Sequence, residues 1–150
     1  MSRRTVLSVV AGAVVLTGAG AFAVAHAGDR PPSVTHGAAR YTAPDGHRRG
    51  SLTFTADVTA PSGVKKVKVL AWPARSSFAE RGLTADDMAG VESARCEPSG
   101  DETARCTYTA DVTPAEADSS PRGRWHVAVL ATTEDGRTTL DTRSADFTIR

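Results

Sequence analysis

The sequence predicts an all-β domain, an antiparallel sandwich of about seven strands with one or two short helical turns. Three observations lead to this fold class. Apolar and polar residues alternate in several separate segments that are rich in β-branched residues. Pro, Gly and Asp residues that favour turns separate these segments at fairly regular intervals. No repeat has a period of about 20–50 residues, so a solenoid is not expected.

The N-terminal segment has the pattern of an export signal. Arg3 and Arg4 form a basic start, an uncharged apolar run follows, and small residues end the run. We therefore predict a signal peptide over residues 1–27, cleaved between Ala27 and Gly28. The alternative is a retained membrane anchor, because the uncharged run is about long enough to span a bilayer. Its many glycines and alanines make it weakly hydrophobic, which favours cleavage.

The start of the chain also bears on the export route. Ser2-Arg3-Arg4-Thr5-Val6-Leu7 resembles the twin-arginine export motif. The alternative is an ordinary basic start that holds two arginines. Both the general secretory and the twin-arginine routes therefore stay open, and by either route we expect the protein to be secreted and extracellular.

Cleavage would leave a flexible lead-in over residues 28–32 and one domain over residues 33–150. Without Arg3 and Arg4 the chain has 16 basic against 17 acidic residues, a net charge of −1 with neutral histidines. This balance does not favour nucleic acid as a partner, and no membrane contact is expected after cleavage. The chain contains no Asn, which excludes N-glycosylation, and no Gln.

The clearest strand covers residues 51–58. Leu52, Phe54, Ala56 and Val58 alternate there with polar residues, as in an antiparallel strand that buries one face. The same criterion gives the full set of expected strands: residues 33–41, 51–58, 64–72, 91–96, 104–112, 125–132 and 137–150.

The last two expected strands form a hairpin around Asp135-Gly136, a pair that favours a turn with positive φ. Phe78 and Leu83, from the segment after the third strand, are expected to close one end of the core. The core itself should contain Leu52, Phe54, Ala56, Val58, Val67, Val69, Trp125, Val127, Val129, Phe147 and Ile149.

Two short helical turns are expected between the strands. Thr84 and Asp87 have the spacing of a capping box, and a turn through Met88 follows them. Thr113 and Glu116 have the same spacing, with a proline at the first helical position.

Cys96 and Cys106 are the two cysteines of the chain. A pair of cysteines in an exported chain most often forms a disulfide. Their symmetric placement about Asp101 favours a link across one hairpin. A metal or redox pair is the alternative, but no Cys-x-x-Cys is present and no histidine is near in sequence.

The residue types that carry chemistry show no recognised pattern. His36, His47 and His126 lack the spacing of metal ligands, and no hydrolase, phosphate-loop or HExxH motif occurs. Asp86-Asp87 and Glu134-Asp135 offer carboxylates, but calcium needs more oxygen ligands than these segments supply. The sequence therefore predicts no catalytic residue, no cofactor and no metal site.

Two groups of basic residues are candidate contacts with a partner. Lys65, Lys66 and Lys68 are clustered on one strand, where they would either touch an anionic polymer or form a solvated face that discourages edge pairing. Arg95 and Arg105 each directly precede one of the two cysteines. A loop braced by these cysteines could offer Arg95 or Arg105 to a protease as an inhibitor does, because a rigid loop loses little entropy on binding.

Two segments resemble bacterial Ig-like domains. The segment 62–69 resembles the strand that follows the Ser-Gly-Val turn in those domains, and the segment 125–136 resembles their late hairpin. With its export signal and its Arg- and Ala-rich composition, the chain resembles an uncharacterised family of small secreted actinobacterial proteins, a domain of unknown function. The resemblance implies an Ig-like sandwich outside the cell and no catalytic residue. The 74–90 insertion and the cysteine hairpin depart from the Ig-like pattern, so strand order stays open.

We therefore expect a secreted, non-enzymatic Ig-like domain that binds an unknown extracellular or cell-envelope partner. The first alternative is a proteinaceous inhibitor of an extracellular hydrolase, and the second is an enzyme with an unrecognised site. A pocket that joins His36, His126 and a carboxylate would favour the enzyme.

Overall fold

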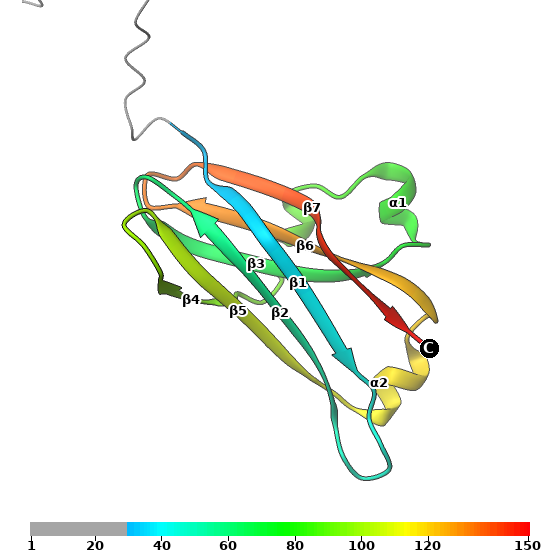
Figure 1. Ribbon diagram of the computed structural model, residues 1–150. Coiled ribbons are helices and arrows are strands. Elements are labelled where there is room, and N and C mark those ends of the chain that lie inside the picture. Colours follow the sequence, from blue (N-terminus) through cyan, green and yellow to red (C-terminus); the bar gives the residue numbers. More distant parts are fainter. Residues whose placement is uncertain (1–29) are drawn as a thin grey trace, which may run out of the picture.

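The structure is a computed structural model that describes residues 30–150, and it confirms the predicted all-β sandwich (Figure 1). The predicted signal peptide, its cleavage between Ala27 and Gly28 and the first residues of the lead-in lie outside the described residues. No helix among residues 30–150 is long and apolar enough to cross a membrane. The elements are β1 (Ser33–Thr42), β2 (Gly50–Thr59), β3 (Val64–Pro73), α1 (Ser77–Arg81), the 3₁₀ helix η2 (Asp86–Met88), β4 (Arg95–Pro98), β5 (Thr103–Val112), α2 (Pro114–Ser119), β6 (Gly123–Thr133) and β7 (Thr138–Ile149).

The strands form two antiparallel sheets packed face to face. One sheet has the order β1-β2-β5-β4 and the other has the order β3-β6-β7. If the seven strands are lettered A to G in chain order, the two sheets become ABED and CFG. This is the strand order of an immunoglobulin constant-type domain. The sequence had left this strand order open.

The main core lies between the sheets and follows the predicted alternation. Phe54 and Val58 of β2 pack with Val67 of β3 and with Val127 and Val129 of β6, and each of the five is at most 1% exposed. Burying a side chain of this kind contributes roughly 1.5–3 kcal/mol relative to leaving it in water.

A second apolar cluster covers the outer face of the three-stranded sheet. Its buried members are Trp72, Leu83, Met88 and Ala128, and Phe78 packs against them. The prediction that Phe78 and Leu83 close one end of the main core is therefore wrong. The segment after β3 folds back over its own sheet because that face carries an apolar Trp and a small Ala on which it can pack.

Trp72 connects all three strands of this sheet across its outer face. The Trp72 indole Nε1 donates to the Thr142 carbonyl of β7 (3.1 Å), and its ring lies 4.7 Å from that of His126. His126 is 5% exposed, and its Nδ1 lies 2.5 Å from Oδ1 of Asp146. The central strand β6 is therefore buried on both faces.

The predicted turn through Met88 is present as η2, with Ala85 rather than Thr84 at the N-cap. Thr84 instead donates its backbone N–H and its hydroxyl to the Asp87 carboxylate, both at 2.9 Å. Arg81 donates to the same carboxylate, at 2.7 and 3.0 Å. These hydrogen bonds, that of Arg81 first, hold the pKa of Asp87 well below its usual range.

The predicted capping box at Thr113 is confirmed. The Glu116 N–H donates to the Thr113 hydroxyl (3.2 Å), and the Thr113 N–H donates to the Glu116 carboxylate (2.7 Å). The short helix α2 can therefore begin directly after β5.

The chain changes sheets between β3 and β4. The Val69 N–H donates to the Glu92 carbonyl (3.1 Å), and the Ala94 N–H donates to the Val67 carbonyl (2.8 Å), so this segment first pairs with β3. From Arg95 onward it pairs with β5 in the other sheet. The fourth strand therefore begins later than the predicted 91–96, because the earlier residues bond to β3. We call this edge of the sandwich the β3–β4 side.

Candidate functional site

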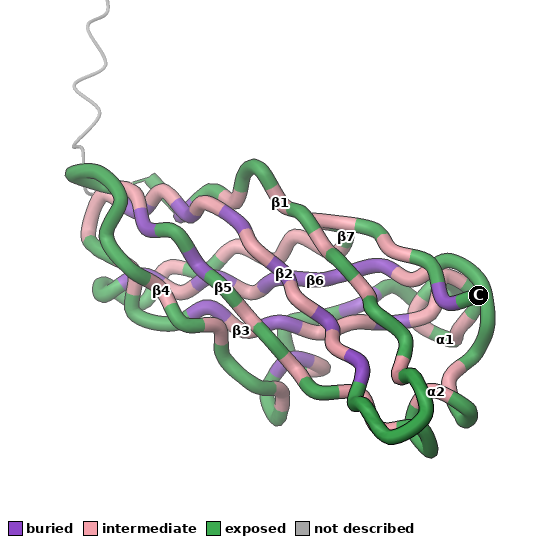
Figure 2. Tube along the Cα trace, turned by 60° about the horizontal axis from the view of Figure 1, so that its bottom comes forward, coloured by how far each residue is buried: buried purple, intermediate pink, exposed green. Residues whose placement is uncertain are grey.

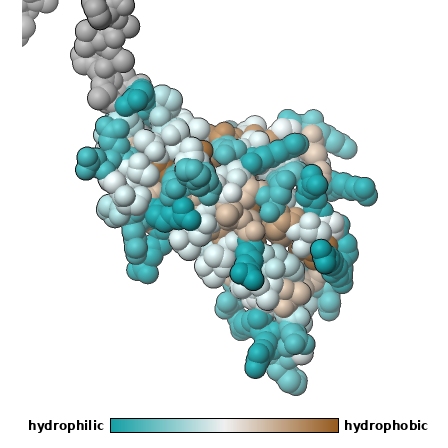
Figure 3. Space-filling view, in the orientation of Figure 1, coloured by the Kyte–Doolittle hydropathy of each residue, from teal (hydrophilic) through white to brown (hydrophobic). Residues whose placement is uncertain are grey.

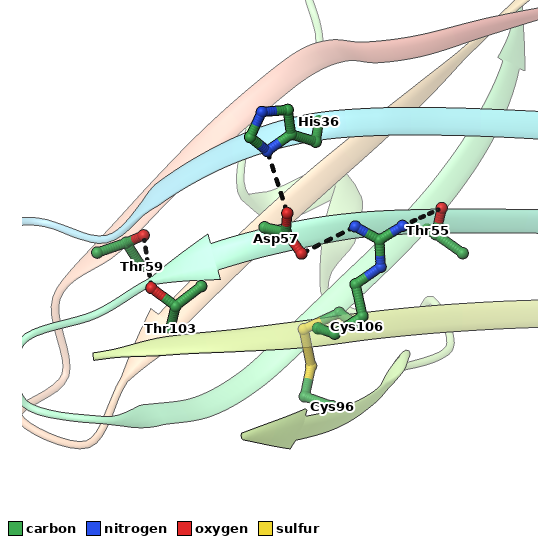
Figure 4. Close-up of polar contacts among 8 residues, drawn as sticks. His36, Thr55, Asp57, Thr59, Cys96, Thr103 and Cys106 are labelled. Carbon is green, nitrogen blue, oxygen red and sulfur yellow. Dashed lines mark hydrogen bonds and ion pairs between the residues drawn. A yellow bond between two sulfur atoms is a disulfide. The ribbon is translucent and has the colours of Figure 1, made fainter. Parts of the chain in front are cut away.

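The predicted disulfide between Cys96 and Cys106 is present and joins β4 to β5 (Figure 4). The two cysteines lie directly opposite each other in the ladder, and Cys106 is fully buried in the core. The bond therefore links neighbours in one sheet, unlike the inter-sheet disulfide of antibody domains. It holds β4 in place just after the chain has changed sheets.

Arg95 and Arg105 lie in β4 and β5 and not in the loop that joins these strands. Arg105 Nη1 donates to Asp57 Oδ1 (2.9 Å), and His36 Nδ1 lies 3.0 Å from the other carboxylate oxygen (Figure 4). Arg105, through its hydrogen bond, lowers the pKa of Asp57. A protease-inhibiting loop must present its key side chain freely, and paired strands do not favour that role.

The three lysines differ in how freely they can meet a partner. Lys65 and Lys66 are exposed. Lys68 is partly buried, and its Nζ donates to the Ala89 carbonyl of the segment after β3. At most two of the three side chains are therefore open to an anionic polymer.

The structure does not bring the candidate histidines together. His36 contacts Asp57 on the four-stranded sheet, whereas His126 contacts Asp146 on the outer face of the three-stranded sheet. His47 lies exposed between β1 and β2. Within residues 30–150 no group of three or more His, Cys, Asp or Glu side chains is placed to hold a metal ion.

The structure reveals a further candidate site along the edge opposite the β3–β4 side. β1 and β7 are edge strands of different sheets, and they lie side by side (Figures 1 and 2). Among the described residues no backbone hydrogen bond joins them. We call this edge, formed by residues 37–43 and 144–150, the β1–β7 seam.

The seam is closed at one end, where the two backbones approach closely. A Cβ atom on Gly37 would lie 2.0 Å from the Ser144 carbonyl oxygen, so only glycine fits at this position. The preceding His36 has a φ of 53°, and the pairing of β1 with β2 shifts here. A β-bulge therefore brings β1 against β7 at this point.

Three stacked aromatic rings hold the other end of the seam open. The ring centroids of Tyr41 and Phe147 are 5.8 Å apart, as are those of Phe147 and Trp125. All three residues are partly exposed. Trp125 and Phe147 were predicted in the core, but they line its open edge, because a hollow enters between the sheets at this end.

A groove of about 520 Å³ runs along this wide end. Ala39, Arg40 and Tyr41 of β1 line it on one side, and Phe147 and Arg150 line it on the other. Figure 3 shows apolar side chains gathered between β1 and β7, bordered by hydrophilic ones. Neither arginine side chain has an ion-pair partner among the described residues, and no Asp or Glu side chain lines the groove. Arg122 donates to the main-chain oxygen of Arg150.

A smaller hollow of about 210 Å³ adjoins the groove and shares Tyr41 and Phe147 with it. Leu52, Trp125 and Ile149 make most of its wall apolar. Asp111 and Glu116 also line it, but both carboxylates have partners: Asp111 pairs with Arg49 (3.6 Å), and Glu116 accepts from the Thr113 N–H (2.7 Å). The groove therefore offers apolar surface beside two arginines that have no ion-pair partner among the described residues, and the adjoining hollow adds a mainly apolar wall.

The sequence did not identify Arg40 or Tyr41 as candidate binding residues. Few large apolar residues mark the first strand, so its inward face was weakly defined. A usable signal was present: Tyr41, Trp125 and Phe147 each lie near an end of an expected strand, where inward rings reach solvent.

These features define an all-β sandwich domain with one disulfide inside a sheet and an uncovered aromatic edge. The chain matches a family of unknown function (DUF5707) over residues 34–131, and it belongs to that family. The match covers β1 to β5 and most of β6, whereas β7 lies beyond it. Comparison with curated proteins gives no match. The predicted resemblance to an uncharacterised family is confirmed, and the family assigns no activity.

Proposed function

We propose that this protein is a secreted, non-enzymatic module that binds a partner at the cell exterior through the β1–β7 seam. The observation that carries the proposal is the aromatic stack of Tyr41, Phe147 and Trp125, which borders a groove that no other described segment covers. Aromatic side chains that stay partly exposed on a rigid scaffold are typical of recognition surfaces.

The location outside the cell is supported by two independent features. Residues 1–27 have the pattern of a secretory signal. The Cys96–Cys106 disulfide is of a kind that persists in oxidising compartments. N-terminal sequencing of the protein recovered from culture medium tests this part, and a chain that begins at Gly28 is the expected result.

Affinity capture from the producing culture tests the binding role. The wild-type protein and a Tyr41→Ala variant serve as baits. Thr109→Ala is the control because Thr109 is exposed on β5, two strands away from β1, and does not line the groove. We expect a partner that the wild type and Thr109→Ala retain and that Tyr41→Ala loses. Circular dichroism checks that all three baits are folded. Equal capture by all three, or no specific capture, contradicts binding through the seam.

A further inference from the structure

We infer that the ligand of the β1–β7 seam is an acidic peptide in extended conformation. This inference rests on the proposed function and adds the chemical class of the partner. Three properties of the seam carry it: free strand edges, unpaired arginines and an apolar hollow beside them.

The free edges favour a peptide over a compact ligand. β1 and β7 each end their sheet, so the edge of each that faces the other lacks a ladder partner among the described residues. An extended peptide meets such groups with its own N–H and C=O groups, which is the basis of recognition by strand addition.

The shape of the seam sets the length of the peptide. Gly37 and Ser144 are in close contact at the narrow end, so a peptide cannot pass there. The groove follows β1 from Ala39 to Ala43, which in a strand is about 13 Å. It therefore takes roughly four or five extended residues.

The charge of the groove favours acidic side chains. Arg40 and Arg150 line it without an ion-pair partner among the described residues, although the chain as a whole is close to neutral. Guanidinium groups bind carboxylates with paired hydrogen bonds, and two unpaired arginines in one groove match two carboxylates.

The apolar part of the site sets the pattern along the peptide. Successive side chains of an extended peptide point to opposite sides. Acidic side chains that meet Arg40 and Arg150 therefore alternate with side chains directed toward Tyr41 and Phe147. The adjoining hollow of about 210 Å³ has room for an aliphatic side chain there. The predicted motif is an alternation of acidic and branched aliphatic residues.

Peptide titrations followed by NMR test the inference, with protein purified after expression of the full-length chain. The probe is an end-blocked hexapeptide of alternating Glu and Val, and the matched peptide carries Lys in place of Glu. We expect the Glu peptide to shift the amide signals of residues 39–43 and 145–149, and the Lys peptide to leave them unchanged. Raising the salt from about 0.05 M to about 0.5 M should weaken binding severalfold, because the charges are partly exposed.

Matched arginine variants locate the contact. The double variant Arg40→Gln/Arg150→Gln should bind the Glu peptide at least about fivefold more weakly, whereas Arg95→Gln should bind within about twofold of wild type. Arg95 is the control because it is exposed on β4, on the opposite side of the sandwich. All are surface changes, and amide spectra check that the variants are folded.

Equal binding of the two peptides, no binding of the Glu peptide, or equal losses in Arg40→Gln/Arg150→Gln and Arg95→Gln would overturn the inference. Capture of a partner that depends on Tyr41, together with failure of the Glu peptide, leaves the binding function standing and removes the acidic-peptide class. Failure of both experiments removes the binding function as well.

Discussion

The two long sides of the sandwich differ in how their strand edges are covered. Each side brings together edge strands of different sheets, and uncovered edges tend to pair with other chains. On the β3–β4 side the chain crosses from one sheet to the other, bonds to β3 on the way and is then fixed by the Cys96–Cys106 disulfide. On the β1–β7 side nothing crosses, and a glycine contact and three rings are the main links.

If the seam binds a partner as proposed, this difference assigns stability to one side of the domain and recognition to the other. The covered side is held by covalent and backbone bonds. The uncovered side keeps free backbone groups, aromatic surface and unpaired charge, which are the properties that a binding site needs. The comparison predicts that perturbing the first side changes mainly stability and that perturbing the second changes mainly binding.

Removing the disulfide should have the largest effect on stability. We expect the Cys96→Ala/Cys106→Ala variant to lose about 3 kcal/mol of unfolding free energy, because the unfolded chain regains the entropy of the closed loop and a small core cavity remains. Urea denaturation of wild type and variant measures this. Binding at the seam should persist under conditions where the variant is folded. A loss below about 0.5 kcal/mol would show that backbone pairing alone holds the covered side.

Filling the narrow end of the seam should cost somewhat less. Gly37→Ala places a methyl group against the Ser144 backbone, which cannot move aside as a flexible side chain can. We expect a loss of about 2 kcal/mol, as for other overpacked sites. Gly90→Ala is the matched control, since no atom lies within 4 Å of its added Cβ. Equal melting temperatures for the two variants contradict the close contact of β1 and β7.

Removing one ring from the open end should cost about 1 kcal/mol of stability, because the ring is only partly buried and the cost is chiefly that of the aromatic contact. Tyr41→Ala tests this in urea, and Phe54→Ala provides the comparison, since a fully buried ring costs about 3–5 kcal/mol. Similar losses for Tyr41 and Phe54 would mean that the stack belongs to the core rather than to an exposed surface.

Titration of Tyr108 tests the covered side, and it changes stability only at alkaline pH. Burial, and then its hydrogen bond to Glu92 (2.9 Å), raise the pKa of Tyr108 to about 12. The neutral phenol is favoured in the folded state, so its contribution to stability is complete below about pH 10, the usual tyrosine pKa. It is lost as the pH rises from there to about 12.

The phenolate absorbance of Tyr108 follows this titration, and Tyr108→Phe identifies its signal. Glu92→Gln removes the negative charge and should lower the midpoint partway toward 10, since burial remains. An unchanged midpoint in Glu92→Gln would show that the segment before β4 does not reach Tyr108.

The features that the sequence predicted well depend on local patterns. Alternation at Phe54, Val58 and Val127 identified inward positions because a strand repeats every two residues. The spacing of Thr113 and Glu116 identified a helix start because the two groups bond to each other. The cysteine pair was predictable because only one intramolecular partner exists for each.

The features that could not be predicted from the sequence depend on contacts between segments that are distant along the chain. Nothing near Phe78 or Leu83 shows that they fold onto Trp72 and Ala128 rather than into the main core. The groove joins Arg40 to Phe147 across most of the domain, and it exists because two sheets end beside each other. No local pattern encodes such a meeting, so the candidate site became visible only in three dimensions.

The contact between Gly37 and Ser144 also constrains when the domain can be completed. It links β1 to β7, so it forms only after residue 144 has been synthesised. Until β7 has emerged, β1 can pair with β2 but has no neighbour on its other edge. Contacts between segments so far apart in sequence also slow folding. Until β7 docks, the free edge of β1 is therefore open to pairing with other chains. A chaperone, or fast docking of β7, would shorten that exposure.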